Sequence, residues 1–163
     1  MLNSDEPLIS IIMNCYNGET YLREAIDSIY AQTYQNWEVI FWDNSSTDNT
    51  AKIAKSYDDR LKYFKSDKTT PLGEARSLAL KEAKGDYLSF LDCDDCLFPN
   101  KLKIQVEILE KNPSVYLLFS SYDVIDARGI LKRDFYVPDN NSVNFCSIIK
   151  RYPINQQTVL FRK

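Results

Sequence analysis

Short apolar runs that alternate with helix-forming stretches constrain the fold of this chain more than any other feature. Residues 8–15 (LISIIMNC) and 38–43 (EVIFWD) are nearly continuous in apolar side chains, a pattern typical of strands buried on both faces of a sheet. Between them, apolar side chains recur at helical spacing at Tyr21, Leu22, Ala25, Ile26, Ile29 and Tyr30. This order predicts an α/β fold with a mostly parallel sheet flanked by helices.

The alternation continues along the 163 residues, a length that suits a single domain. Two of the predicted helices have clear stop signals. One is followed by Gly85, a C-cap glycine, and the other ends at the Asn112-Pro113 pair. After residue 121 the pattern changes, and we expect a C-terminal hairpin over 123–136 and a last strand over 158–161 that makes the sheet mixed. The remaining predicted elements are helices from the polar loop 44–48 through residue 57, over 72–84, over 99–112 and over 143–150, and strands over 61–65, 87–91 and 115–120.

Composition and charge exclude several classes of protein. The net charge is −3 and there is no basic stretch, which argues against a nucleic-acid binder, because such proteins must neutralise phosphates. No apolar run approaches the roughly 20 residues needed to span a bilayer, and the polar, acidic start over 1–7 is not that of a signal peptide. We therefore expect a cytoplasmic protein in a reducing compartment.

The chain contains no histidine, which excludes Ser-His-Asp and Cys-His catalysis and histidine-ligated zinc within it. Any metal site should therefore use oxygen ligands. The four cysteines are Cys15, Cys93, Cys96 and Cys146. The Cys93-x-x-Cys96 spacing also fits a redox or zinc motif, but two aspartates between the thiols oppose thiolate formation, so we expect free thiols.

Polar residues follow three of the predicted strands, and ligands of open parallel sheets bind at the carboxyl ends of the strands. Asn14 and Tyr16 follow the first strand, Asp43 ends the second, and residues 92–95 (DCDD) follow the fourth. Three carboxylates in four residues repel one another unless a cation lies among them, and Mg²⁺ or Mn²⁺ is commonly held by carboxylates together with substrate phosphates. The alternative is a helix N-terminus carrying acids. Neither GxGxxG nor GxxxxGK[ST] occurs, which excludes dinucleotide-binding Rossmann and P-loop proteins.

Four segments in order resemble the inverting family 2 of glycosyltransferases, which has the Rossmann-like GT-A fold. The family's opening strand, Tyr-Asn turn and Asp-rich loop correspond to ISIIMNCYNGETYLREAIDSIYAQTYQNWEVIFWDNSSTDNT, and its central helix and DxD strand to GEARSLALKEAKGDYLSFLDCDD. The helix after DxD corresponds to FPNKLKIQ, and the strand before the acceptor half to INQQTVLFRK. The chain departs from the family at Asn14, where Pro is usual, and at residues 43–46, where Asp-Asp-Gly-Ser is usual.

The resemblance implies a nucleotide site. Tyr16 would stack on the base with Asn14 beside it, and Asp43 would accept a hydrogen bond from a ring N–H, which suits uracil. Arg76 would approach the nucleotide from the third helix. The alternatives from the residues alone are turn packing for Tyr16, capping of the following loop for Asp43 and a surface cation for Arg76.

The resemblance also implies a metal site. Asp92 would face the ribose and the metal, and Asp94 would ligate an Mn²⁺ or Mg²⁺ ion that bridges both phosphates of the donor. Asp95 would be a structural cap, and Cys93 becomes the variable residue of the DxD motif.

The implied activity is transfer, with inversion, of a sugar from a nucleotide-diphosphate donor, best matched by a UDP-sugar, to a glycan or lipid-linked acceptor in polysaccharide or glycoconjugate biosynthesis. The full-length enzyme would associate peripherally with the inner face of the membrane. Because the family's catalytic base lies in the half after the last strand, we expect the base beyond Lys163, and residues 1–163 to be one nucleotide-sugar-binding domain truncated before the acceptor half.

Three other functions are alternatives, and the sequence argues against the second and the third. A nucleotide-sugar-binding module without turnover would share every donor motif. A sugar-nucleotide pyrophosphorylase would need a glycine-rich phosphate loop with a basic residue after the first strand, where the chain has YNGETYLRE. A response-regulator-like domain would need a single phosphorylatable aspartate and a lysine at a later strand end, which the sequence does not offer.

Overall fold

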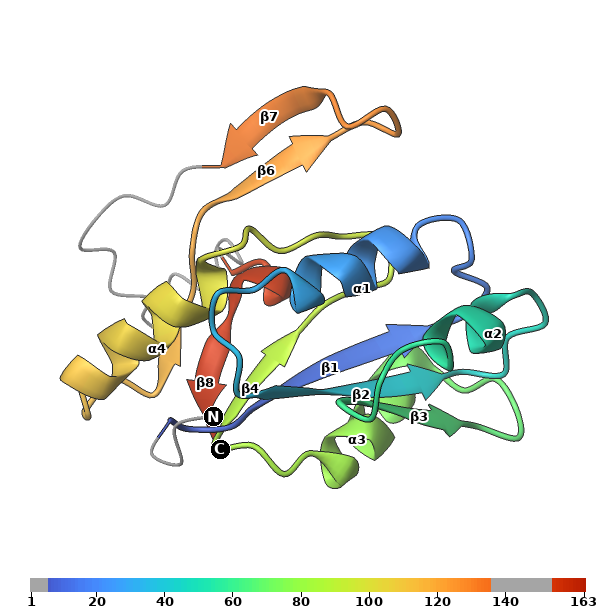
Figure 1. Cartoon of the computed structure of the whole chain (residues 1–163), viewed down its shortest axis with the longest axis horizontal. Coiled ribbons are helices and arrows are strands. Elements are labelled where there is room, and N and C mark those ends of the chain that lie inside the picture. Colours follow the sequence, from blue (N-terminus) through green and yellow to red (C-terminus); the bar gives the residue numbers. More distant parts are fainter. Residues whose placement is uncertain (1–5, 136–153) are drawn as a thin grey trace.

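The computed structural model describes residues 6–135 and 154–163, and its centre is a six-stranded sheet (Figure 1). The strand order is β3-β2-β1-β4-β8-β5. β1 pairs in parallel with β2 and β4, and β2 in parallel with β3, whereas β8 is antiparallel to β4 and β5. The strands are β1 Ile9–Cys15, β2 Trp37–Asp43, β3 Leu61–Lys65, β4 Tyr87–Phe90, β5 Leu117–Leu118 and β8 Leu160–Arg162. The expected α/β fold with a mostly parallel, mixed sheet is confirmed.

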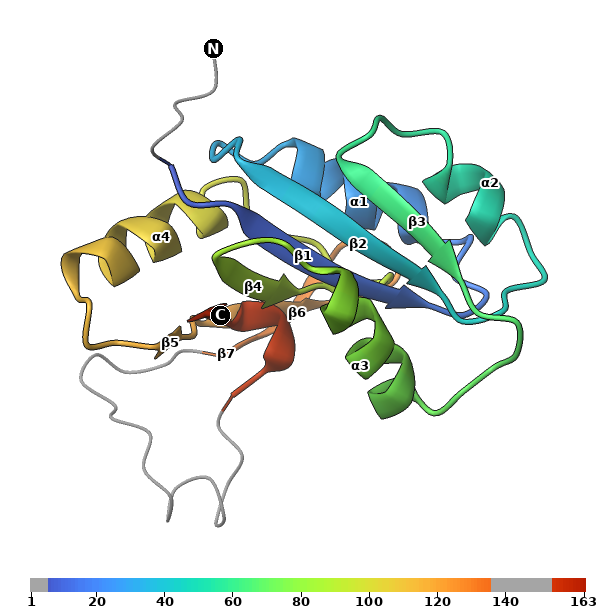
Figure 2. The same ribbon diagram turned by 90° about the horizontal axis from the view of Figure 1, so that it is seen from below.

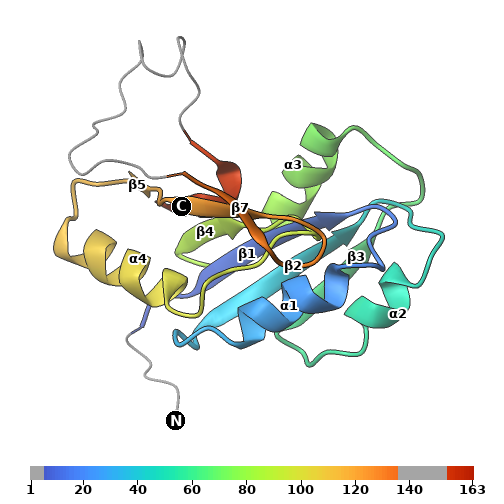
Figure 3. The same cartoon turned by 90° about the horizontal axis from the view of Figure 1, so that it is seen from above.

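Helices cover both faces of this sheet. Figure 3 shows α1, α2 and α4 on one side and α3 on the other, and Figure 2 shows the same separation from below. The core is divided accordingly: Ile11 and Met13 of β1 pack towards α1, whereas Ile12 packs towards Ala79 of α3. The helices are α1 Leu22–Tyr30, α2 Thr50–Ala54, α3 Leu72–Glu82 and α4 Lys101–Lys111, with a 3₁₀ turn, η1 Gln156–Thr158, before β8. No helix in these described ranges is long and apolar enough to cross a membrane.

The expected C-terminal hairpin is confirmed, and it forms a sheet of its own. β6 Tyr122–Ile125 pairs antiparallel with β7 Leu131–Phe135. Figure 1 shows this hairpin standing apart from the six-stranded sheet. Its turn contains Gly129, whose φ of 74° is a left-handed conformation that glycine adopts at low cost.

Several predicted boundaries of helices and strands were wrong. α2 ends at Ala54 rather than residue 57, because the amides of Ser56 and Tyr57 bond three residues back, in a tightening turn. The predicted strand over 115–120 is reduced to β5, and the last strand begins only at Leu160, after η1. The helix predicted over 143–150 lies outside the described residues.

Gly85 has a different role from the predicted C-cap. α3 already ends at Glu82, and Gly85 lies against the backbone of β1. A Cβ at this position would lie 2.5 Å from the backbone nitrogen of Ser10. Close approach between two backbone segments, rather than helix termination, therefore requires glycine here.

Candidate functional site

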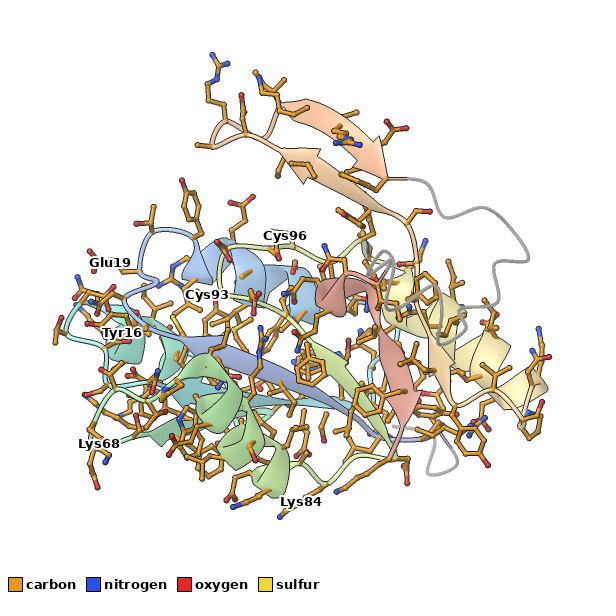
Figure 4. The ribbon with its side chains drawn as sticks, turned by 180° about the vertical axis from the view of Figure 1, so that it is seen from behind. Tyr16, Glu19, Lys68, Lys84, Cys93 and Cys96 are labelled. Carbon is orange, nitrogen blue, oxygen red and sulfur yellow. The ribbon has the colours of Figure 1, made fainter. Side chains whose placement is uncertain are left out.

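The site predicted from the sequence lies at the carboxyl edge of the sheet, where β1, β2 and β4 end. The parallel register places Cys15 of β1 beside Asp43 of β2, and Ile12 of β1 beside Phe90 of β4. The loops that leave these strands therefore emerge together. Figure 4 shows Tyr16, Glu19 and Cys93 on the loops at this edge, with Lys84 at the far end of α3.

Tyr16 is held on a rigid loop. Its side chain is 54% exposed, while Asn17, the next residue, adopts a left-handed backbone with φ of 52°. The Asn17 amide donates to Ser46 Oγ (3.0 Å), and Asn17 Oδ1 accepts from the amide of Thr47 (2.8 Å). These bonds join the loop after β1 to the loop after β2 and leave the aromatic ring of Tyr16 free to contact a ligand.

A second set of bonds between the same two loops involves residues that sequence reasoning missed. The Glu19 amide donates to Asp48 Oδ2 (3.0 Å), and Glu19 Oε2 accepts from the amide of Asn49 (2.9 Å). The Gly18 amide donates to Thr50 Oγ1 (3.0 Å). Their only signal in the sequence is the cluster of capping residues in the polar loop, which does not say which donors it will accept from.

Asp43 is more deeply buried than a hydrogen bond to a nucleotide base would require. The residue is 0% exposed. Its Oδ2 accepts from the hydroxyl of Tyr63 (2.5 Å) and its Oδ1 from the amide of Ser46 (2.7 Å). Burial, together with this hydrogen bond to Asp43, raises the pKa of Tyr63. The observed contacts are those of the alternative role, a cap for the following loop, and the contact with a nucleotide base stays a prediction.

Arg76 and Asp92 are brought together by the fold. Arg76, on α3, donates through Nη2 to Asp92 Oδ1 at 2.8 Å, and the two side chains are 20% and 37% exposed. Arg76 Nη1 also donates to Gln156 Oε1 (2.8 Å). Gln157, in the same 3₁₀ turn, donates through Nε2 to Asp92 Oδ2. Arg76 is thus part of a network at the sheet edge rather than a solvated helix cation.

Asp94 and Asp95 lie on the turn after β4, closed by a hydrogen bond from the Asp95 amide to the carbonyl of Asp92 (3.3 Å). Asp94 is exposed and forms no ion pair within the residues that the structure describes. Burial, then the charges of Asp94 and Asp92, raise the pKa of Asp95. Negative charge at this turn is therefore not fully compensated by the protein.

These carboxylates fit a divalent cation only in part. No group of three or more acidic or cysteine side chains in the described ranges could hold a metal ion by itself. The oxygens of Asp94 are accessible, whereas both oxygens of Asp92 already accept hydrogen bonds. Such a set suits Mg²⁺ or Mn²⁺, which usually takes one or two carboxylates and completes its shell with water and substrate phosphates.

Asn14 has a buried side chain without a partner. The residue is 8% exposed, and neither its Oδ1 nor its Nδ2 has a hydrogen-bond partner among the described residues. The indole Nε1 of Trp42, its register neighbour on β2, is also unpartnered there. Leaving a buried polar group unsatisfied costs about 1–3 kcal/mol. A ligand that paired with the Asn14 amide would recover part of that cost.

Cys15 and Cys93 meet at this edge. A Cβ at Gly18 would collide with both sulfurs, which explains the glycine there. The hydrogen bond with Cys93, followed by burial, raises the pKa of the Cys15 thiol. Cys15, Cys93 and Cys96 are free thiols, and Cys146 lies outside the described residues. That none of them holds a metal stays a prediction.

Comparison with known proteins gives consistent relatives. Residues 10–158 match the sequence model of Glycosyl transferase family 2. An uncharacterized glycosyltransferase of Rickettsia felis is 40% identical over 146 residues, which cover 85% of this chain and 24% of that protein. The UDP-Glc:alpha-D-GlcNAc-diphosphoundecaprenol beta-1,3-glucosyltransferase WfgD of Escherichia coli is 34% identical over 157 residues, covering 96% of this chain and 60% of WfgD. The chain therefore spans less than two thirds of these relatives.

Solved structures show the same fold. S. aureus TarS 1-349 in complex with UDP has a TM-score of 0.76 at 27% identity and covers 94% of this chain and 46% of that one. The mannosyltransferase PcManGT from Pyrobaculum calidifontis, in complex with GDP-Man and Mn²⁺, has a TM-score of 0.69 at 20% identity and covers 98% and 45%. The expected GT-A fold is confirmed by these matches.

Proposed function

We propose that this chain, which belongs to glycosyltransferase family 2, binds the nucleotide-diphosphate sugar from which a sugar is transferred. The proposed donor is a UDP-sugar. One observation carries the proposal: the exposed Tyr16 ring, the Arg76–Asp92 pair and the exposed Asp94 carboxylate lie on neighbouring elements at one edge of the sheet. This edge is where open parallel sheets bind ligands. The three features match the three parts of the nucleotide diphosphate in such a donor, which are a base, a ribose and a diphosphate.

The base would lie against Tyr16, since an exposed, rigidly mounted aromatic ring offers a stacking surface. The unpartnered amide of Asn14 provides one donor and one acceptor, which match the adjacent N–H and carbonyl of uracil. The preference for uracil is supported by TarS, whose structures contain UDP and UDP-GlcNAc. Asp43 would need to exchange its bond with Tyr63 or Ser46 to contact the base, whereas the buried amide of Asn14 has no bond to give up among the described residues.

The diphosphate would lie over the turn after β4. Asp94 would hold a divalent cation, Mn²⁺ or Mg²⁺, with Asp92 turned towards both the ribose and the metal. When bound, the cation would act as a Lewis acid that neutralises charge on the departing diphosphate. Arg76 would compensate the charge of Asp92, with which it is paired, and the cation would compensate the charge of Asp94 and the phosphates.

The transfer itself would proceed by in-line attack of an acceptor hydroxyl on the anomeric carbon, with inversion. The hydroxyl needs a base within hydrogen-bond reach, worth typically 10²–10⁴-fold in rate. Asp126 of the hairpin is held by Lys132 and by amides of its own turn, which lower its pKa and make it a poor base. Asp123 and Asp134 face each other across the hairpin, and Asp139 lies outside the described residues. We place the base in sequence that would follow Lys163 in a longer form.

A lipid-linked or glycan acceptor, used at the cytoplasmic face of a membrane, completes the proposal. WfgD supports it, since its name specifies a diphosphoundecaprenol acceptor. The metal-dependent and inverting character of the reaction belongs to the same proposal.

Calorimetry with UDP tests donor binding directly. We expect binding in the presence of Mn²⁺ and its loss in chelator, with weaker binding of GDP and CDP at equal metal concentration. Equal affinity for UDP with and without chelator would exclude the metal. No binding of any nucleotide diphosphate would exclude the function.

A product assay separates transfer from the alternative, a nucleotide-sugar-binding module without turnover. We expect a longer form to transfer sugar to acceptor and the 163-residue chain to bind donor while transferring poorly. Equal transfer rates would place the base within the 163 residues, and a longer form that binds donor but never transfers it would favour the binding module.

A further inference from the structure

The side chain of Gln157 both accepts a hydrogen bond from Asp92 and donates one to it. The backbone amide of Asp92 donates to Gln157 Oε1 (3.0 Å), while Gln157 Nε2 donates to Asp92 Oδ2. One primary amide thus accepts from the backbone and donates to the carboxylate of the same residue. An amide can do both, whereas a carboxylate cannot donate and an aliphatic side chain can do neither.

The adjacent residue, Gln156, forms a hydrogen bond with Arg76. Its Oε1 accepts from Arg76 Nη1 (2.8 Å), and Arg76 Nη2 then reaches Asp92 Oδ1 (2.8 Å). The two oxygens of Asp92 are therefore held by different elements, one by α3 and the other by η1. Two such restraints determine both the position and the rotation of the carboxylate.

The 3₁₀ turn that carries the two glutamines is itself fixed to the sheet and to α4. Asn155 Oδ1 accepts from the amide of Gln157 (3.0 Å), and Thr158 Oγ1 donates to the carbonyl of Asn155 (2.6 Å). From α4, Gln105 Nε2 donates to the carbonyl of Thr158 (2.7 Å), and from β4, Ser89 Oγ donates to the carbonyl of Val159 (2.9 Å). The two glutamines therefore lie on a turn that is held in place by hydrogen bonds.

We propose that Gln157 is a positioning residue for Asp92, and Gln156 for Arg76, so that metal-dependent donor binding is set from the turn before β8. This inference rests on the proposed function, because it assigns Asp92 to the ribose and metal. Partners that orient a metal ligand typically contribute 10–100-fold to metal affinity or activity. The turn lies 65 residues from Asp92 in sequence and is brought beside it by the antiparallel pairing of β4 and β8.

The first test is Gln157→Glu, which keeps the size and removes the donor. A carboxylate facing Asp92 should rotate it away, and we expect the affinity of Mn²⁺ for the UDP complex to fall 10–100-fold, measured as free Mn²⁺ by electron paramagnetic resonance. Gln156→Leu should have a smaller effect, less than about tenfold, because Arg76 keeps its bond to Asp92. The control Gln35→Glu makes the same change on the exposed segment between α1 and β2 and should leave the affinity unchanged. A Gln157→Glu affinity within about twofold of wild type would overturn the inference.

The second test asks whether the effect is positional or a general loss of structure. In the double variant Asp92→Asn with Gln157→Glu, the asparagine amide donates to the new carboxylate, so the lost side-chain bond is restored with donor and acceptor exchanged. The bonds from Arg76 and from the backbone amide of residue 92 keep their direction. We expect the melting temperature to return to the wild-type value while Mn²⁺ affinity stays low, because the carboxylate now lies on the wrong residue. Recovery of both would contradict the assignment of Asp92 as the residue being positioned.

The third test needs no ligand and so separates this inference from the proposed function. Hydrogen exchange at the Asp92 amide, followed by NMR, should be faster in Gln157→Leu than in wild type, since the acceptor is lost. If wild type binds no nucleotide but this amide is deprotected, the positioning contact stands and the proposed function fails. If the amide exchanges at the same rate in both, Gln157 does not hold Asp92.

Discussion

The loops after β1 and β2 differ sharply from the turn after β4, although all three belong to one edge of the sheet. The first two are joined by hydrogen bonds through Asn17, Gly18 and Glu19. The turn after β4 instead carries Asp94, exposed and without an ion pair in the described part of the chain, beside an Asp95 of raised pKa. The loops after β1 and β2 therefore satisfy each other's hydrogen bonds, whereas the turn after β4 retains negative charge that a ligand could neutralise.

This difference suits the two parts of a nucleotide-diphosphate donor. A base needs a fixed surface on which to stack, and the linked loops provide one at low entropic cost. A diphosphate with its cation brings its own charge and ligands, so the turn has only to supply accessible carboxylates. Variants of the turn should therefore change ligand binding more than stability, and variants of the side chains that link the two loops should do the reverse.

The largest expected effect is that of Asp94→Asn at the turn. Loss of the carboxylate should weaken UDP binding in Mn²⁺ by at least about 100-fold, because even an outer partner of a metal ligand is typically worth 10–100-fold. The melting temperature without ligand should stay close to wild type, since Asp94 is exposed. Calorimetry and a thermal melt measure the two quantities. A large loss of stability with unchanged affinity would reverse the roles of the two regions.

Tyr16→Ala should have the next largest effect. Stacking of a base on an aromatic side chain is worth about 1–3 kcal/mol, so UDP affinity should fall between about fivefold and 150-fold at saturating Mn²⁺. Tyr16→Phe keeps the ring and serves as the control. If Phe and Ala weaken binding equally, the hydroxyl rather than the ring contacts the nucleotide.

Asp48→Ala tests the linked loops through stability. Asp48 accepts from the amides of Glu19 and Thr50, and loss of such a capping side chain costs about 0.5–2 kcal/mol of unfolding free energy. Burial opposes the charged form of Asp48, but the bonds from Thr50 and Glu19 outweigh it and lower the pKa. The stabilisation should therefore be complete above the pKa of Asp48 in the unfolded chain, about 3.9. It should be lost as the pH falls through the lower pKa that Asp48 has in the folded protein.

Urea titrations of wild type and Asp48→Ala at pH 7 and at pH 3 measure this difference. The gap in unfolding free energy should be larger at pH 7. A gap that does not change with pH would show that packing, rather than the carboxylate, is responsible.

The smallest expected effect is a gain of stability from Ser45→Gly. Ser45 has φ of 70°, a left-handed conformation that costs a residue with a side chain roughly 1–2 kcal/mol. Glycine relieves this strain but loses more entropy on folding, so we expect a net gain of about 0.5–1 kcal/mol in urea unfolding. A loss of stability would mean that the Ser45 side chain has a compensating contact in solution.

Local patterns in the sequence were enough to place β1, β2 and β4 and to put Tyr16, Asp92 and Asp94 at their ends, because burial of a strand depends on a run of apolar neighbours. The helix boundaries were less predictable. α3 ends at Glu82, before Gly85, and glycine is required at residue 85 by close approach to the backbone of Ser10, far away in sequence.

The individual partners in the site were decided by the tertiary structure alone. Nothing near Asp43 in sequence shows that Tyr63 will bond to it, and nothing near Asp92 shows that Gln157 and Arg76 will. Such partners come from the strand order β3-β2-β1-β4-β8-β5, which is set by burying both faces of the sheet at once. Periodicity reports which side of its own element a residue faces, whereas hydrogen-bond partners depend on which other element arrives there.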